Sequence, residues 1–159
     1  RKLKFSEALF DFHQLVNDIA EEMQQTMSSH KININLDATE IVYGDRNRIG
    51  QVITNMLSNA IKYSPKAGKI NVTSIHKKAF LKFCVQDFGI GISIENQVRV
   101  FEQFYRVSGL VQDTFSGLGS GLFISSEIIK RTHGTMSVNS ELGQGSSFCF
   151  TLPLNKNPG

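Results

Sequence analysis

The chain of 159 residues is long enough for one domain with a substantial core, and its 40% hydrophobic and 19% charged residues are ordinary for a globular protein. The net charge of +3 comes from Lys and Arg scattered along the sequence, which does not indicate a nucleic-acid-binding protein. No apolar run approaches a membrane span and no stretch resembles a signal peptide, so we expect a cytoplasmic location. Cys84 and Cys149 each lie in an apolar run, which predicts two buried core thiols rather than a zinc or redox pair.

The first half of the chain predicts two helices and two strands. Residues 1–10 are typical of a tail or a short edge strand, and Asp11 with Gln14 resembles a capping box that opens a helix. Alternating apolar residues in "HKININL" predict a strand, and "EIVYG" predicts another. A second helix is expected to begin at Asp45, its N-cap, and to end before Pro65.

The second half predicts mostly strands joined as hairpins. "KINVTSIHKKAFLKFCVQ" indicates a hairpin, residues 94–104 a short helix, 105–117 a polar loop and 119–133 a third long helix. "TMSVNS" and "SFCFTLP" predict the last two strands. Strands and helices do not alternate strictly, so we expect an α+β fold. This would be a two-layer sandwich, with three main helices on one face of a mixed, mostly antiparallel sheet of about five strands.

The second predicted helix carries polar residues at the edge of its apolar face. Asn55 and Asn59 are four residues apart there, and Lys62 and Tyr63 follow. Buried amides need hydrogen-bond partners. One interpretation is that both amides bind loop backbone. The other is that two amides, a cation and an aromatic ring meet a metal, a phosphate and a base.

Two glycine clusters follow. In "DFGIGI" the Asp87 carboxylate can accept a hydrogen bond from an amine such as that of adenine, while Gly89 and Gly91 let the backbone approach a flat ring; a plain turn is the alternative. In "SGLGSGL" glycines precede a helix, whose N–H groups attract anions; a flexible loop is the alternative. The spacing matches neither a dinucleotide fingerprint nor a P-loop.

The ordered set Asn-x-x-x-Asn-Ala-x-Lys-Tyr, Asp-x-Gly-x-Gly, Phe-x-x-Phe-Tyr-Arg and Gly-x-Gly-x-Gly resembles the N, G1, F and G2 boxes of sensor histidine kinases, members of the GHKL ATPase superfamily. The resemblance implies that Asn55 binds Mg²⁺ and that Asn59 and Lys62 hold the phosphates of ATP. It also implies that Tyr63 lies beside the nucleotide and that Asp87 binds the adenine amine.

The resemblance assigns further residues to the same site. Gly89 and Gly91 would line the base pocket, and Ser146 would support the adenine-binding acid. Phe101 and Phe104 would anchor a lid whose end is formed by Gly117, Leu118, Gly119, Ser120 and Gly121, with Leu118 and Ser120 standing where Thr and Leu are more frequent. Asn55, Lys62 and Arg106 form the expected catalytic set.

The resemblance also implies the reaction and its partners. Related ATPases activate water with a glutamate four residues before the first asparagine, but here Gln51 offers no basic carboxylate. None of the four histidines is followed by Glu or Asp, as a phosphoacceptor would be. The γ-phosphate is therefore expected to pass to a histidine on an upstream dimerisation domain and then to a response regulator aspartate. An anti-sigma type serine kinase, a degenerate signalling module and a ligand-free interaction domain are the alternatives.

These expectations define the organisation of the protein. Residues 1–10 would link to the missing upstream domain, 11–154 would form the catalytic domain and 155–159 a tail. Because the chain begins with Arg1, we expect it to be a piece of a longer protein. The isolated domain is expected to be a monomer and its parent a homodimer, with no bound nucleic acid and no membrane contact by this domain.

Overall fold

The computed structural model describes residues 4–37, 40–102 and 118–154, with the backbone alone for 118–120. Within these ranges a five-stranded sheet has the order β2-β4-β5-β7-β6. β2 runs parallel to β4, whereas β4–β5, β5–β7 and β6–β7 are antiparallel. The mixed, mostly antiparallel sheet is thus confirmed. The strands are β2 (Lys31–Leu36), β4 (Lys69–His76), β5 (Phe80–Asp87), β6 (Met136–Glu141) and β7 (Gly145–Pro153).

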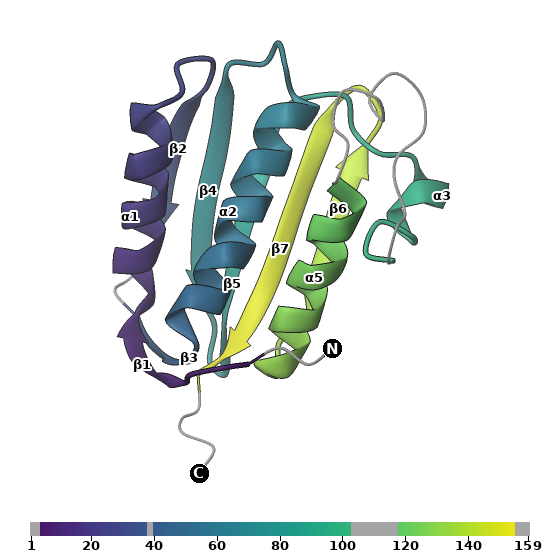
Figure 1. The fold of residues 1–159 in the computed structure, drawn as a ribbon. Helices are drawn as coiled ribbons and strands as arrows, with labels where there is room; N and C mark the ends of the chain where they lie inside the picture. The colour runs from purple at the N-terminus through teal and green to yellow at the C-terminus, as the bar shows by residue number, and fades with distance from the viewer. Residues whose placement is uncertain (1–3, 38–39, 103–117, 155–159) are drawn as a thin grey trace.

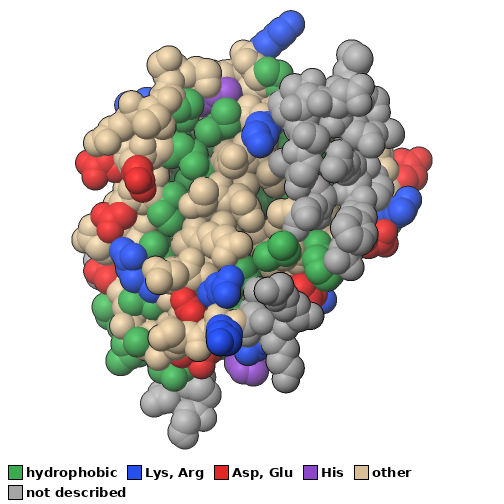
Figure 2. Space-filling model, in the orientation of Figure 1, with side chains coloured by type: hydrophobic (Ala, Val, Ile, Leu, Met, Phe, Trp, Pro, Cys, Tyr) green, Lys and Arg blue, Asp and Glu red, His purple; other side chains and the backbone are tan. Residues whose placement is uncertain are grey.

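Three helices cover one face of this sheet and lie side by side, with α2 in the middle (Figure 1). They are α1 (Phe12–Gln25), α2 (Arg46–Tyr63) and α5 (Leu118–Arg131). A small antiparallel pair, β1 (Ala8–Asp11) and β3 (Ile41–Gly44), lies beside the start of α1. The two-layer α+β sandwich is confirmed. On the helix face, charges of both signs are interspersed (Figure 2).

The predicted helix starts are also confirmed. The Asp11 carboxylate accepts a hydrogen bond from the backbone N–H of Gln14 at 3.0 Å, and Asp45 accepts one from that of Arg48 at 3.0 Å. Each bond satisfies an N–H group that a helix start leaves unpaired. In the part of the chain that is described, no helix is both long enough and apolar enough to cross a membrane.

The core lies between the sheet and the helices. Phe12 of α1 meets Phe83 of β5 and Phe150 of β7, with ring centroids 5.5 and 6.1 Å apart. These edge-to-face contacts add to the burial of the rings, which are fully enclosed. The apolar face predicted for α2 is buried against this core as well: Ile49, Val52, Ile53, Met56, Leu57 and Ala60. The core thus fixes α2 over the centre of the sheet.

Two local expectations need correction. Of the short helix expected within residues 94–104, the structure shows the single turn α3 (Ile94–Gln97), which lies beside β6; residues 103 and 104 lie outside the described residues. Cys84 and Cys149 are not separate thiols but form a disulfide. The two residues are direct cross-strand neighbours of β5 and β7, with their Cα atoms 4.1 Å apart. The register of two strands distant in sequence brings them together.

Candidate functional site

The side chain of Asn55 joins α2 to α5. Its amide nitrogen donates to the hydroxyl oxygen of Ser125 at 3.2 Å and to the carbonyl of Gly121 at 3.4 Å. A Cβ atom at Gly121 would already touch the amide, 3.7 Å from its carbon. Among the described residues the Asn55 side-chain oxygen has no hydrogen-bond partner, so it is left as an acceptor or ligand atom. The structure thereby brings two predicted site residues, Asn55 and Gly121, into contact.

One turn further along α2, Asn59 is buried, with 5% of its surface exposed. Its side-chain nitrogen has no hydrogen-bond partner among the described residues. An unpaired buried amide costs about 1–3 kcal/mol. Asn59 therefore carries a buried donor that no described residue satisfies.

Lys62 and Tyr63 end α2 and differ in exposure. Lys62 is exposed, whereas Tyr63 has only 4% of its surface exposed. The Tyr63 carbonyl accepts a hydrogen bond from the backbone N–H of Ile90 at 3.2 Å. This bond joins the end of α2 to the segment that follows β5.

Asp87 ends the central strand β5 and has 2% of its surface exposed. Its carboxylate accepts hydrogen bonds from the backbone N–H groups of Gly89, at 2.9 Å, and of Ser146. Burial raises the pKa of the Asp87 carboxyl, while these two bonds and the nearby His30 act in the opposite direction. The result is a buried acceptor held in place by backbone.

Gly89 and Gly91 allow the chain to pack against itself. A Cβ atom on Gly89 would lie 2.0 Å from the Tyr63 carbonyl oxygen, and one on Gly91 would lie 2.1 Å from that of Glu141. Gly91 also has φ of +75°, which favours glycine. The sequence suggested that these glycines allow close approach to a flat ring. The structure gives a second reason, which is close approach to the protein's own backbone.

Ser146 is the second residue of β7 and is buried beside Asp87. It stands directly opposite Ser140 of β6, and the two hydroxyl oxygens are 2.7 Å apart. Sequence reasoning missed Ser140 and also Gln97, whose amide nitrogen donates to the carbonyls of Ile92 and Ser140 at 2.8 and 2.9 Å. Only the alternation of residues along "TMSVNS" could have placed Ser140 on the same face as Ser146.

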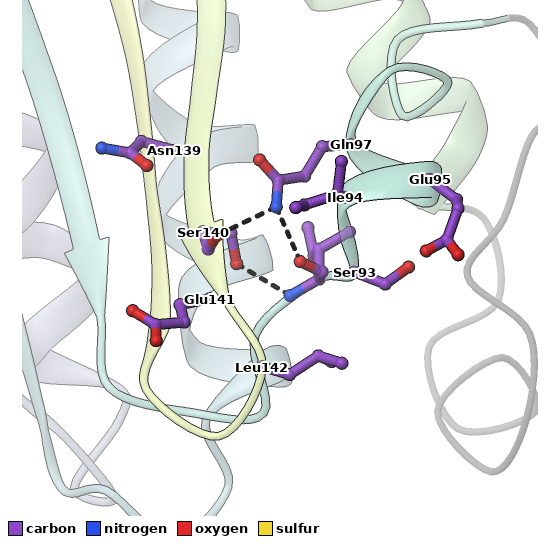
Figure 3. A pocket seen from close by; sticks show the side chains of 9 residues that line it. Ser93, Ile94, Glu95, Gln97, Asn139, Ser140, Glu141 and Leu142 are labelled. Carbon is purple, nitrogen blue, oxygen red and sulfur yellow. Dashed lines mark hydrogen bonds between the residues drawn. The ribbon is translucent and has the colours of Figure 1, made fainter.

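A groove of about 760 Å³ lies next to these residues, between residues 92–97 and the end of β6 (Figure 3). Ser140 and Gln97 are among its lining residues, and the exposed side chains of Ile94 and Leu142 lie at its edge. Asp87 and Asn55 are not among the residues that line the groove. The groove is therefore a neighbour of the candidate site and not the site itself.

Several predicted site residues lie outside the described residues: Phe104, Arg106 and Gly117. Leu118, Gly119 and Ser120 form the first turn of α5.

Phe101 packs edge-on against Phe148, with ring centroids 6.0 Å apart. Gln51 is exposed, and its side-chain oxygen accepts a hydrogen bond from Arg48 at 3.4 Å. Among the described residues no group of three or more His, Cys, Asp or Glu side chains could hold a metal ion.

The chain matches known families along most of its length. The family described as histidine kinase-, DNA gyrase B- and HSP90-like ATPase matches residues 44–156. The adaptive-response sensory kinase SasA of Thermosynechococcus vestitus is 34% identical over 157 residues, 96% of this chain and 41% of the relative. The sensor protein RprX of Bacteroides fragilis is 40% identical over 131 residues, 80% of this chain and 25% of the relative. The chain thus spans less than half the length of these relatives.

Solved structures agree in fold. The catalytic domain of histidine kinase ThkA, solved without nucleotide, has a TM-score of 0.81 and 25% identity, and the match covers 97% of this chain and all of that one. Full-length ShkA, solved in complex with AMPPNP, has a TM-score of 0.80 and 28% identity. That match covers all of this chain but 33% of ShkA.

Proposed function

The chain belongs to the family of histidine kinase-, DNA gyrase B- and HSP90-like ATPases, and we propose that it is the ATP-binding catalytic domain of a sensor histidine kinase. In this proposal residues 11–154 form the domain that binds ATP. The γ-phosphate passes to a histidine on a separate dimerisation domain and then to an aspartate of a response regulator. We place the domain in the cytoplasm, alone or as part of a membrane-anchored receptor.

The buried amide of Asn59 is the observation that carries this proposal. Its nitrogen is enclosed without a partner among the described residues, one turn from Asn55. Natural proteins leave few buried donors unpaired, and those that remain call for an explanation. A phosphate oxygen of ATP is an acceptor of the right kind. Lys62, exposed at the end of the same helix, would add positive charge to the phosphates.

Asn55 suits a magnesium ion on the same phosphates. Mg²⁺ prefers oxygen ligands and takes most of them from water and phosphate, so one neutral amide oxygen is a sufficient contribution from the protein. Because the Asn55 nitrogen donates to Ser125, its oxygen has a fixed direction and is available. When bound, Mg²⁺ neutralises charge on the phosphates.

Asp87 suits the adenine end. Its carboxylate is buried and held by two backbone N–H groups, and it retains lone pairs for a third donor. An exocyclic amine supplies such a donor. Burial raises the cost of leaving a polar group unpaired, so a base without this amine would bind less well.

The absence of a base at position 51 supports transfer to an external acceptor. Gln51 carries an amide, which cannot take a proton from water at neutral pH. Phosphoryl transfer depends mainly on positioning and charge stabilisation, so a nucleophile brought in by a partner can react without such a base on this chain. Arg106, Gly117, Leu118, Gly119 and Ser120 are proposed to close over the phosphates, and Tyr63, Gly89, Gly91 and Ser146 to surround the base.

Calorimetry with ATP and Mg²⁺, followed by phosphotransfer, tests the proposal. The domain should bind ATP, and with radiolabelled ATP it should label an added helical fragment carrying the parent's acceptor histidine. The product should be acid-labile and base-stable. Asn55→Ala should fail to label the fragment, whereas Thr54→Ala, an exposed neighbour on α2, should label it normally. Label on this chain alone, or rapid ATP hydrolysis without the fragment, would contradict the proposal.

A further inference from the structure

The hydroxyl group of Ser140 makes three hydrogen bonds at the end of β6. The backbone N–H of Ile92 donates to its oxygen at 2.7 Å (Figure 3). The hydroxyl also lies 2.9 Å from the carbonyl oxygen of Gly145 and 2.7 Å from the hydroxyl oxygen of Ser146. A hydroxyl group has one proton to donate and two lone pairs to accept with, so all of its capacity is used.

The direction of each bond follows from counting protons. A carbonyl only accepts, so the single proton of Ser140 is donated to Gly145. Ser140 then has no proton left for Ser146, and the bond between the two hydroxyls requires Ser146 to be the donor. The proton of Ser146 is thereby directed toward Ser140. Only lone pairs of Ser146 remain for any other group.

This arrangement determines the polarity of the site around Asp87. The backbone N–H of Ser146 is already bonded to the Asp87 carboxylate, which places the serine directly beside the acid. A carboxylate accepts and does not donate. With the Ser146 proton directed away, both side chains offer acceptors only. A ligand group at this position must therefore donate, as a 6-amino purine does and a 6-oxo purine does not.

Gln97 keeps Ser140 in this orientation. Both carbonyls that its side chain meets, those of Ile92 and Ser140, can only accept, so the nitrogen must face them (Figure 3). The two hydrogen bonds of the Gln97 amide and the bond from the Ile92 N–H to the Ser140 hydroxyl together hold the segment after Gly91 against β6. The Ser140 hydroxyl therefore has fixed partners in the segment before α3 and on β7, while Gln97 of α3 holds the Ser140 carbonyl.

We propose that Ser140 is a specificity-determining positioning residue, which takes the proton of Ser146 and so makes the base site select amino over oxo purines. The inference rests on the proposed ATP-binding function. It predicts that removing the Ser140 hydroxyl does more than weaken binding. The freed Ser146 hydroxyl can rotate and donate to an oxo group, so affinity for the wrong base should rise.

The experiment compares ATP with inosine triphosphate, which carries a carbonyl where ATP carries its amine. Calorimetry gives both dissociation constants for the wild type, Ser140→Ala, Ser140→Thr and Ser137→Ala. We expect the preference for ATP to fall about tenfold in Ser140→Ala, the size of one hydrogen bond, with an absolute gain in inosine triphosphate affinity. Ser140→Thr should restore the preference. Ser137→Ala, an exposed site on the same strand, should not change it.

A double variant tests whether Ser140 acts through the Ser146 hydroxyl or only supports the fold. In Ser140→Ala with Ser146→Ala, the gain for inosine triphosphate should disappear, because no hydroxyl remains to donate. If Ser140→Ala does not fold, Ser140→Cys gives the same comparison with a weaker acceptor. An unchanged preference in folded Ser140→Ala, or in Ser140→Cys if Ser140→Ala does not fold, with a wild type that selects ATP, would overturn this inference alone. A wild type that binds neither nucleotide would overturn the proposed function and the inference with it.

Discussion

The side-chain nitrogen of Asn55 on α2 donates to the hydroxyl oxygen of Ser125 on α5, 3.2 Å away. The two residues are 70 positions apart in the sequence, and Ser125 is fully buried. The bond fixes which end of the amide faces α5 and which end remains available. It therefore connects the packing of two helices to the atom that we propose as the magnesium ligand.

Asn55→Ala should separate metal-dependent from metal-independent binding. We expect ADP affinity without metal to stay nearly unchanged, because the proposed adenine contact at Asp87 is not altered, while phosphorylation of an added acceptor is abolished. Titration calorimetry in EDTA and a phosphotransfer assay with Mg²⁺ measure the two effects. Equal loss of metal-free ADP binding would make Asn55 a structural residue.

Ser125→Ala tests the orientation of the same amide. Removing the hydroxyl leaves the Asn55 nitrogen with only the longer bond to Gly121, so the amide can turn. We expect a weaker dependence of phosphotransfer on Mg²⁺, with folding retained. Ser58→Ala, a half-buried serine on α2, is the control and should leave the Mg²⁺ dependence as in the wild type.

Asp87→Asn should weaken ATP binding in a pH-dependent way. The loss should be about 1–3 kcal/mol, because an amide nitrogen replaces one acceptor oxygen. Burial raises the pKa of the Asp87 carboxyl above its ordinary 3.8. ATP affinity of the wild type should therefore fall as pH is lowered through that raised pKa, since a protonated carboxyl accepts poorly. Asp87→Asn has no carboxyl to protonate at this position. The difference between the pH dependence of ATP affinity in the wild type and in Asp87→Asn therefore separates the effect of Asp87 protonation from that of ATP protonation.

The free energy of unfolding of the nucleotide-free domain should change with pH in the opposite direction to the ATP affinity. Between 3.8 and the raised pKa, folded Asp87 holds a proton that the unfolded chain has released. The contribution of this group to the free energy of unfolding therefore increases as pH falls through that range. Urea titrations of wild type and Asp87→Asn at several pH values measure it. A difference between them that does not vary with pH would contradict the raised pKa.

The helices were predictable because their signals are local. Asp45 is a good N-cap residue, and the apolar residues of α2 recur at the spacing that buries one face, so neighbours in sequence decide the structure. Asn55 and Asn59 could be singled out for the same reason. Both are polar residues at the edge of a face that had to be buried.

The rest of the site depends on strand register, which the local sequence does not specify. Ser140 meets Ser146 because β6 pairs with β7 across a tight turn, and its bond to Ile92 bridges 48 positions. Cys84 meets Cys149 only because β7 inserts between β5 and β6. The bond of Ser140 to Ile92 and the pairing of Cys84 with Cys149 join residues far apart in the sequence, which no spacing rule connects.

Gly89→Ala should be more damaging than its mild chemistry suggests. The added Cβ would lie 2.0 Å from the Tyr63 carbonyl oxygen, so the end of α2 or the segment after β5 must move. We expect a loss in the free energy of unfolding of about 3 kcal/mol, the upper range for overpacking. Gly143→Ala is the matched control, because it has open space and only the strain of φ +80°, about 1–2 kcal/mol. Equal losses in urea denaturation would show that the contact with Tyr63 is easily relieved.

Reduction of the Cys84–Cys149 disulfide should destabilise the domain without abolishing nucleotide binding. The bond closes a loop with a sequence separation of 65, so its removal should lower the free energy of unfolding by about 2–4 kcal/mol. The backbone pairing of β5 with β7 and the N–H groups that hold Asp87 remain, so ATP affinity should change little. Urea denaturation with and without dithiothreitol measures the first effect and calorimetry the second. The double variant Cys84→Ser with Cys149→Ser should show no response to dithiothreitol. Two free thiols in the untreated wild type, counted with a thiol reagent, would contradict the cross-link.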